Sequence, residues 1–289
     1  MYPETFWNKP VPAKYRKALE GLGLPLDISR RDLFRCVAFT DSGRPRNILG
    51  SSSKVEKGEG AGVFTAILYL SPGREAGINM CPMAAGCEAG CLGSTSRRMT
   101  WPTHKKARVS KTIWLMLFRE HFLRRLSWEI IGHAMTAEAM DMKPAIRLNG
   151  SSDVLWENYN VPQSHPEVQF YDYTKLPAKA RAGVPDNYHL TFSLCERPES
   201  KGRALEWLNA GRNVAVVVGG KSTTDRPGVM LKAAKAAAAT IIERGTFDGF
   251  PAVSGDNDDI RFDDPPGAWV VLYAKSGALT DSTGFVQRF

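Results

Sequence analysis

Residues 62–92 read GVFTAILYLSPGREAGINMCPMAAGCEAGCL, and this stretch holds the two features that decide the fold and the candidate site. Its first nine residues are rich in β-branched and aromatic side chains, which predicts a buried strand over 62–70. Three of the five cysteines of the chain follow, Cys81, Cys87 and Cys91, with the spacing C-x5-C-x3-C. Three thiolates in one short loop repel one another unless a cation or cluster lies between them. The spacing therefore indicates a metal or iron–sulfur site.

Outward from this stretch, the chain alternates between short apolar runs and helical segments. Further strands are predicted at 145–149, 168–173, 189–194, 213–218 and 269–274. Helices are expected at about 104–139, 154–163, 175–182, 200–211 and 228–244. This alternation predicts βα units and a mainly parallel sheet.

The expected fold class is α/β, a complete or partial TIM-like βα barrel with the cysteine loop after its first strand. No linker, internal repeat or low-complexity tract divides the chain, so we expect one domain over residues 1–289. Within it we distinguish an N-terminal extension, a core of βα units and a C-terminal closing segment, at residues 1–60, 62–245 and 246–289.

Polar side chains stand at the carboxyl ends of the predicted strands, where α/β folds place their ligand sites. Because the cysteine loop also follows a strand, we expect these side chains and the three thiols at one rim of the sheet. The candidate substrate- or cofactor-binding residues are Arg147, Asp153, Lys175, Glu196 and Lys221.

Most of these candidates also have a structural interpretation. Asp153 and Lys175 can form an ion pair between adjacent strand ends. Glu196 can cap the helix expected at 200–211. Arg147, inside a strand, can neutralise a neighbouring carboxylate or the negative charge of a cluster. Both kinds of interpretation remain open from the sequence.

The identity of the metal depends on the number of ligands. A structural zinc site needs four protein ligands, so the three thiols would need His104 or Cys195 as the fourth. A [4Fe-4S] cluster held by three thiolates leaves one iron open for a substrate, a cofactor or a weaker ligand. We favour the cluster because the loop follows a strand of a βα array, and we keep Cys195 as a candidate fourth ligand. Cys36 lies in an apolar stretch and is expected to be a buried core thiol.

The formal net charge of +8 suggests a nucleic-acid partner. Basic residues cluster at 97–98, 105–108 and 124–125, but others are spread over the whole chain and no nucleic-acid-binding motif accompanies them. We therefore interpret them as a solvated surface and keep nucleic acid as a secondary hypothesis. The acidic run at 253–264 lacks the ligand pattern of a calcium loop and is expected to be solvated.

No apolar run is long enough to span a membrane, and the first residues lack the pattern of a secretory signal. We therefore expect a cytoplasmic protein with reduced thiols and no membrane partner. An odd number of cysteines also argues against a fully paired set of disulfides.

The strand, the three-cysteine loop and the βα units that follow resemble the radical SAM superfamily of iron–sulfur enzymes. In that superfamily three cysteines bind a [4Fe-4S] cluster whose open iron chelates S-adenosylmethionine. The resemblance implies a barrel of the radical SAM type and this cofactor. The chain departs from the superfamily spacing C-x3-C-x2-C, and Gly219-Gly220-Lys221 has a cation where the superfamily has a carboxylate.

A second set of motifs is more specific. It comprises Gly50-Ser-Ser-Ser-Lys54, the Cys-Pro-x-Ala…Cys…Cys loop, Arg147-Leu-Asn-Gly-Ser-Ser-Asp153, Phe170-Tyr-Asp-Tyr-Thr-Lys175, Pro185-Asp-Asn-Tyr-His-Leu-Thr-Phe-Ser193 and Tyr273-Ala-Lys-Ser-Gly…Gly284-Phe-Val. These motifs resemble the gene-product-88 family of phage proteins over most of residues 47–289. The resemblance implies a phage origin, a barrel-like fold and a location in the cytoplasm of an infected host cell.

Three functions follow from these features. The first is an enzyme in which a [4Fe-4S] cluster on Cys81, Cys87 and Cys91 reacts with a small-molecule ligand at the open iron, with electrons from an external donor. The second is a non-enzymatic iron–sulfur protein for electron transfer, sensing or fold stability. The third is a zinc-stabilised module that binds nucleic acid.

Overall fold

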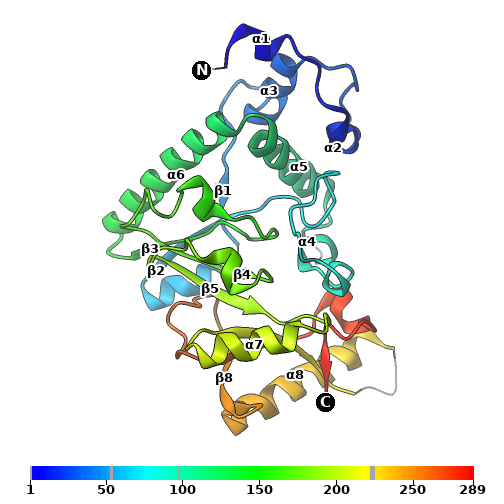
Figure 1. Cartoon of the computed structure of the whole chain (residues 1–289), viewed down its shortest axis with the longest axis vertical. Coiled ribbons are helices and arrows are strands. Elements are labelled where there is room, and N and C mark those ends of the chain that lie inside the picture. The colour runs from blue at the N-terminus through cyan, green and yellow to red at the C-terminus, as the bar shows by residue number, and fades with distance from the viewer. Residues whose placement is uncertain (1, 53–54, 97, 222–224) are drawn as a thin grey trace.

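The computed structural model describes residues 2–52, 55–96, 98–221 and 225–289 (Figure 1). Ser53, Lys54 and Arg97, which belong to segments considered above, lie outside the described residues. The strands form a mostly parallel sheet in the order β1-β2-β3-β4-β5-β6-β9-β8-β7, and β10 pairs with β6. Their bounds are β1 (Leu49–Gly50), β2 (Val63–Leu68), β3 (Lys143–Arg147), β4 (Gln169–Thr174), β5 (Tyr188–Ser193), β6 (Val214–Gly219), β7 (Thr246–Phe247), β8 (Phe250–Ser254), β9 (Trp269–Tyr273) and β10 (Gln287–Arg288).

The six strands predicted from the apolar runs coincide with β2, β3, β4, β5, β6 and β9, so these predictions are confirmed. They pair in parallel, with Thr65 of β2 opposite Ala145 of β3 and Tyr171 of β4 opposite His189 of β5. Among the described strands, the antiparallel pairs are the short ones at the two ends of the sheet, β1 with β2 and β7 with β8.

The sheet does not have the strand order of a TIM barrel. β9 lies between β6 and β8, so β8 and β9 stand in the sheet in the reverse of their order along the chain. Within the described residues, β1 and β7 end the sheet on its two sides and no strand pairing joins them. The expected α/β fold class with a mostly parallel sheet is confirmed, whereas the pairings of the described strands do not show a closed barrel. The β7–β8 hairpin takes the edge position, and β9 takes the inner position beside β6.

Helices α6, α7 and α8 pack on the sheet, with α6 against β2 and β3, α7 against β5 and β6, and α8 against β6, β8 and β9. α2 and α3 pack on α5 instead, at the opposite end of the molecule from β8 (Figure 1). None of the described helices is both long enough and apolar enough to cross a membrane. The helix bounds are α1 (Glu4–Trp7), α2 (Arg16–Leu22), α3 (Arg30–Ala38), α4 (Leu92–Thr95), α5 (Pro102–Leu117), α6 (Arg119–Ala139), α7 (Ser200–Asn209) and α8 (Pro227–Arg244).

Three helix predictions need correction. The helix expected at 104–139 is divided into α5 and α6 at Phe118, whose backbone (φ −123°, ψ 46°) leaves the helical region. The segments 154–163 and 175–182 contain only short 3₁₀ helices, and Asn160 ends the first of them in the left-handed region (φ 54°). The 3₁₀ helices are η1 (Ala13–Tyr15), η2 (Glu56–Ala61), η3 (Gly86–Glu88), η4 (Trp156–Tyr159), η5 (Ala178–Arg181) and η6 (Ser276–Thr280).

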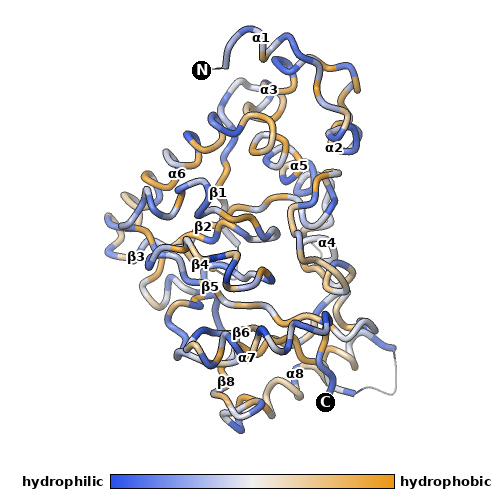
Figure 2. The backbone as a smooth tube through the Cα atoms, in the orientation of Figure 1, coloured by the Kyte–Doolittle hydropathy of each residue, from blue (hydrophilic) through white to orange (hydrophobic). Residues whose placement is uncertain are grey.

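Side chains alternate between the two faces of the sheet along each strand. On the face covered by helices, Phe192 of β5 packs on Trp207 of α7 with 5.6 Å between their ring centroids. On the other face, Arg147, Tyr173 and Val217 line a cavity. In Figure 2 the tube is hydrophilic at α2. The largest buried apolar cluster joins residues of the strands with residues of the helices that pack on them.

The loop between β8 and β9 bridges the open face of the sheet. Ile260 belongs to one buried cluster with Val63 of β2 and Ala145 of β3. Next to it, Asp259 is buried and pairs with Arg147 of β3. The acidic run at 253–264 was expected to be a solvated loop, and that expectation is wrong for its middle part. The carboxylate of Asp259 can be buried because Arg147 of β3 compensates its charge.

Candidate metal centre

A cavity of about 740 Å³ lies at the carboxyl ends of the parallel strands. Cys81, Cys87 and Cys91 all line it, so the loop after β2 contributes three thiols to one space. This agrees with the rim location expected from the sequence. Other polar residues of the wall come from the ends of β3, β4 and β5 and from the segments after β8 and β9: Arg147, Asn149, Asp153, Tyr173, Lys175, Ser193, Asp256 and Lys275.

Hydrogen bonds to the end of β3 fix the first turn of the cysteine loop. The N–H of Asp153 donates to the carbonyl of Met80 (2.9 Å). The N–H of Cys81 donates to Asn79 Oδ1 (3.0 Å), and its thiol donates to the carbonyl of Ser151 with 3.7 Å between sulfur and oxygen. Cys81 is therefore held between its own loop and the segment that follows β3.

Glu196 fixes the second turn, just before Cys87. The N–H of Gly86 donates to Glu196 Oε1 at 2.5 Å, and Glu196 Oε2 is buried without a hydrogen bond within the described residues. A Cβ on Gly86 would lie 2.1 Å from Thr283 Oγ1, so this close approach requires glycine. Glu196 was expected to bind a ligand or to cap α7. The N-cap of α7 is Glu199, so the capping interpretation is wrong. Glu196 supports the loop through Gly86, and its role toward a ligand stays a prediction.

Burial makes the thiols of Cys81 and Cys87 weaker acids than free cysteine. It raises the pKa of Cys81 to about 12, with further increases from the Asp153 carboxylate and the other two thiols. Burial also raises the pKa of Cys87, and the ammonium group of Lys175 lowers it. These two thiols are therefore protonated at neutral pH, and binding of a metal or cluster releases their protons.

The three thiols line one cavity, but they are not arranged as the ligands of a metal ion. Within the part of the chain that the structure describes, no group of three or more His, Cys, Asp or Glu side chains is arranged to hold a metal ion. The donor chemistry nevertheless fits an iron–sulfur cluster, since three cysteines of one loop share one space and cationic side chains stand beside them. Binding would require the loop to draw its thiols together.

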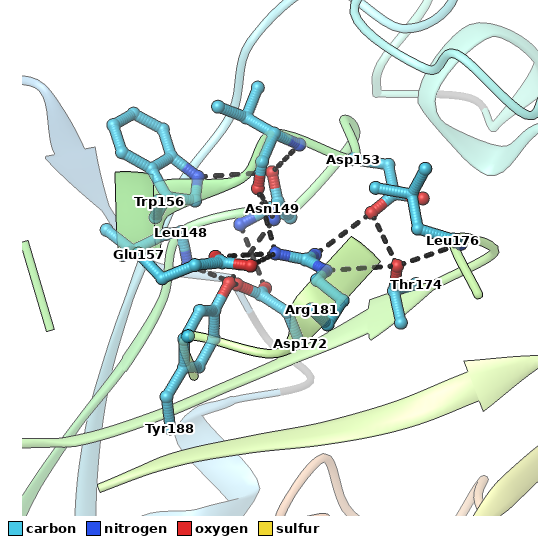
Figure 3. A network of polar contacts seen from close by, with 12 residues as sticks. Leu148, Asn149, Asp153, Trp156, Glu157, Asp172, Thr174, Leu176, Arg181 and Tyr188 are labelled. Atoms are coloured by element: carbon cyan, nitrogen blue, oxygen red, sulfur yellow. Dashed lines mark hydrogen bonds and ion pairs between the residues drawn. The ribbon is translucent and has the colours of Figure 1, made fainter. Parts of the chain in front are cut away.

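A buried polar network joins the ends of β3 and β4 (Figure 3). Asp153 Oδ1 lies 3.1 Å from Arg181 Nη2, and Arg181 Nη1 lies 2.7 Å from Glu157 Oε2. Asp153 also accepts hydrogen bonds from Thr174 Oγ1 and from the N–H of Lys175, each at 2.9 Å. Burial raises the pKa of Asp153, although Arg181 lowers it.

The ion pair expected between the side chains of Asp153 and Lys175 is corrected by this network. The partner of Asp153 is Arg181, because the segment after β4 turns back in η5 instead of continuing as a helix. Lys175 reaches β5 instead, where its Nζ donates to Ser193 Oγ at 2.7 Å and lies 5.2 Å from the ring centroid of Phe285. Its ammonium group thus remains in the cavity wall.

Arg147 also lies in the cavity wall. It pairs with Asp259 and lies 5.7 Å and 5.2 Å from the ring centroids of Tyr171 and Tyr173. Burial lowers the pKa of the guanidinium, but the Asp259 carboxylate outweighs this effect and keeps the pKa above its ordinary value. The interpretation of Arg147 as a partner for a neighbouring carboxylate is thus confirmed.

Other predicted residues do not line the cavity. Lys221 is exposed beyond β6, and His104 is exposed on α5. Cys195 is buried in a small apolar cluster, against which Cys87 packs from the cavity side. Cys36, expected in the core, is only half-buried on α3. The structure thus brings together the three loop cysteines, but neither candidate fourth ligand lines the same space.

A second ion pair of the cavity was missed from the sequence. Lys275 Nζ lies 2.5 Å from Asp256 Oδ1 and 4.1 Å from the ring centroid of Tyr273. Both charged residues line the cavity, beyond the ends of β9 and β8. Lys275 directly follows the strand predicted at 269–274, just as Lys175 follows the strand at 168–173. Polar residues at the carboxyl ends of all predicted strands, including the last one, would therefore have included Lys275.

The family model for gene product 88 matches residues 46–288, which span the sheet from β1 to β10 and include the cysteine loop. The chain belongs to the gene product 88 family. The resemblance carried by the sequence motifs is thereby confirmed. Helices α1, α2 and α3 precede the matched residues and lie outside the family match. Comparisons with curated proteins and with solved structures gave no match.

Proposed function

We propose that this member of the gene product 88 family is an iron–sulfur protein that binds one [4Fe-4S] cluster through Cys81, Cys87 and Cys91. The observation that carries the proposal is that all three thiols line one cavity at the carboxyl ends of parallel strands. In α/β folds this is the usual position of a ligand site. A cluster held by three thiolates supplies one iron without a cysteine ligand, which can bind a small molecule.

The charge of the cavity wall supports this assignment. Three thiolates give the cluster a net negative charge, which costs free energy in a partly buried site unless cations lie nearby. Lys175 lies close enough to Cys87 to lower the pKa of its thiol. Lys275 and Arg147 stand in the same wall, although each is also paired with an aspartate.

The size of the cavity favours an enzyme over a simple electron carrier. A volume of about 740 Å³ is in the range of small-molecule sites, and an electron-transfer protein needs no such space. We therefore propose a redox or radical reaction on a small molecule in this cavity, with electrons from an external donor. Lys175 and Lys275 would orient anionic groups of that molecule, such as a carboxylate. S-adenosylmethionine, implied by the radical SAM resemblance, is the first ligand to test.

Anaerobic purification followed by metal analysis tests the cluster. We expect about four irons and four sulfides per chain, with the visible absorption of a [4Fe-4S] centre. Cys81→Ala, Cys87→Ala and Cys91→Ala should each lose most of the iron. Cys36→Ala is the matched control and should keep it. One zinc per chain without sulfide would refute the cluster and favour the zinc module.

Two further measurements examine the open iron. Cys195→Ala should keep the iron content, since Cys195 lies outside the cavity wall. Addition of S-adenosylmethionine to the reduced protein should change its electron paramagnetic resonance spectrum if this molecule binds the open iron. A spectrum that no small anionic ligand changes, together with iron loss in Cys195→Ala, would show a fully ligated, non-enzymatic cluster.

A further inference from the structure

Helix α6 presents a stripe of large apolar side chains to solvent. Trp128, Ile131 and Met135 are 72%, 48% and 65% exposed. Spacings of three and four residues place them on one face of the helix, while Leu126 and Ile130 are fully buried on another. Single exposed apolar residues are ordinary, but three neighbours on one helix face indicate a contact surface. The stripe is separate from the cysteine cavity, which no described residue of α6 lines.

Opposite charges bound this stripe. Arg124 lies one turn before Trp128, and Glu138 lies three residues after Met135, and both charged residues are exposed. The helix dipole disfavours an acidic side chain in the last turn, where Glu138 stands. The order of charges therefore does not stabilise the helix itself. It makes the stripe complementary to an identical stripe that runs in the opposite direction.

We propose that two copies of this chain pair through α6, antiparallel about a two-fold axis that passes between Ile131 and Gly132. In this arrangement Trp128 meets Met135 of the partner subunit, and Ile131 meets Gly132 of the partner subunit. The two-fold axis makes each of these contacts occur twice. α6 lies along an outer edge of the molecule, where a second copy can reach it (Figure 1).

The same pairing brings each Arg124 close to Glu138 of the partner subunit. The distance from Arg124 to Glu138 along the helix is about 21 Å at 1.5 Å per residue, and the axis lies within about one residue of its midpoint. A parallel pairing would instead place Arg124 beside Arg124 of the partner subunit. Charge complementarity therefore selects the antiparallel arrangement.

Gly132 and a neighbouring groove fit this arrangement. A Cβ on Gly132 would meet no atom within 4 Å in the chain, so nothing inside one copy requires a glycine in this helix. In the pair, the missing side chain leaves room for Ile131 of the partner subunit. A groove of about 660 Å³ beside the stripe, lined by Met135, Met142 and Pro144 among others, can take the indole of Trp128 of the partner subunit.

Sedimentation equilibrium of the full chain, from about 1 to 100 µM, tests the pairing. We expect a dimer in the wild type, at concentrations typical of a modest interface. Ile131→Glu should yield a monomer, and because Ile131 is already half exposed this variant should fold as the wild type does. Arg124→Glu alone and Glu138→Arg alone should each weaken the dimer about tenfold or more, since each reversal acts at two symmetric sites.

The double variant R124E/E138R is decisive. It restores opposite charges in the antiparallel pairing and should return the dissociation constant to within about threefold of the wild-type value. Gly132→Leu should abolish the dimer while circular dichroism shows an unchanged fold. A wild type that is monomeric at 100 µM overturns the proposal. So does a double variant as weak as the two single variants, because the charges would then not face each other.

Discussion

Arg181→Met removes the central cation of the network in Figure 3. The guanidinium of Arg181 has no exposed surface and contacts two carboxylates, Glu157 at 2.7 Å and 2.9 Å and Asp153 at 3.1 Å. It also donates weakly to the carbonyl of Val154 and to Thr174 Oγ1, each at 3.4 Å. Methionine fills similar volume but provides no donor, so all of these contacts are lost together.

The expected loss of stability follows from the burial of the partners. Breaking a buried ion pair by removing one member costs about 3–5 kcal/mol, because the other member stays buried and unpaired. Here two carboxylates lose their partner, and Asp153 and Glu157 are only 9% and 2% exposed. We therefore expect a loss near the upper end of this range. Domains are stable by about 5–15 kcal/mol, so the variant should be severely destabilised.

Urea unfolding followed by circular dichroism measures this loss as a shift of the transition midpoint. Lys179→Met is the matched control, because Lys179 is exposed two residues away, and it should change the stability by less than about 0.5 kcal/mol. Arg181→Lys should lie between the two, since a lysine keeps the charge but cannot contact both carboxylates with a planar group.

The pH dependence gives a second readout. Burial already raises the pKa of Asp153, and loss of Arg181 removes the main group that lowers it. A carboxyl group whose pKa is higher in the folded state takes up protons on folding, so it loses stability as the pH rises. The deficit of Arg181→Met should therefore be larger at pH 8 than at pH 5. A loss below about 1 kcal/mol, or a deficit that shrinks with rising pH, would refute the reasoning.

Three further predictions concern the loop and the core. Gly86→Ala should lower the iron content and destabilise by about 1–3 kcal/mol, because its Cβ would clash with the C-terminal segment, whereas Gly202→Ala, in open space on α7, should not. Complete burial raises the pKa of Asp172 to about 7, so unfolding experiments should show stability falling by up to about 4 kcal/mol from pH 4 to pH 7, a slope that Asp172→Asn should reduce strongly. Glu129→Gln should cost about 1–3 kcal/mol in thermal or urea unfolding, since its carboxylate accepts from the N–H groups of Ile48 and its neighbour, and a loss below about 0.5 kcal/mol would contradict this.

The sequence predicted those strands and helices that depend only on neighbouring residues. β2, β6 and β9 are nearly continuous apolar runs, as expected for strands that are largely buried on both faces. β3, β4 and β5 also carry polar or charged residues, and their apolar and aromatic residues identified them. The helix expected at 154–163 failed because Asn160 adopts a left-handed backbone conformation that periodicity does not detect. The prediction of one undivided helix over 104–139 failed for the same kind of reason. Phe118 alone leaves the helical region, and one such residue is enough to end a helix.

The order of the strands was beyond such patterns. Nothing within the sequence of β8 or β9 tells which of them pairs with β6, because pairing depends on contacts between segments far apart in the chain. The same holds for Asp259, which looks like part of a solvated acidic run and is buried against Arg147. Arg181 was overlooked as the partner of Asp153 for this reason as well.

The sequence by itself determined that three thiols stand at one rim of a parallel sheet. That result needs only the spacing of Cys81, Cys87 and Cys91 and their place after the first long strand, both of which are local. Only the tertiary structure decided what surrounds them: the cavity itself, the contact of Lys175 with Ser193, and the ion pair of Lys275 with Asp256 in the cavity wall. Such surroundings are set by the packing of distant segments, and the free energy of that packing cannot be read from any single stretch of the chain.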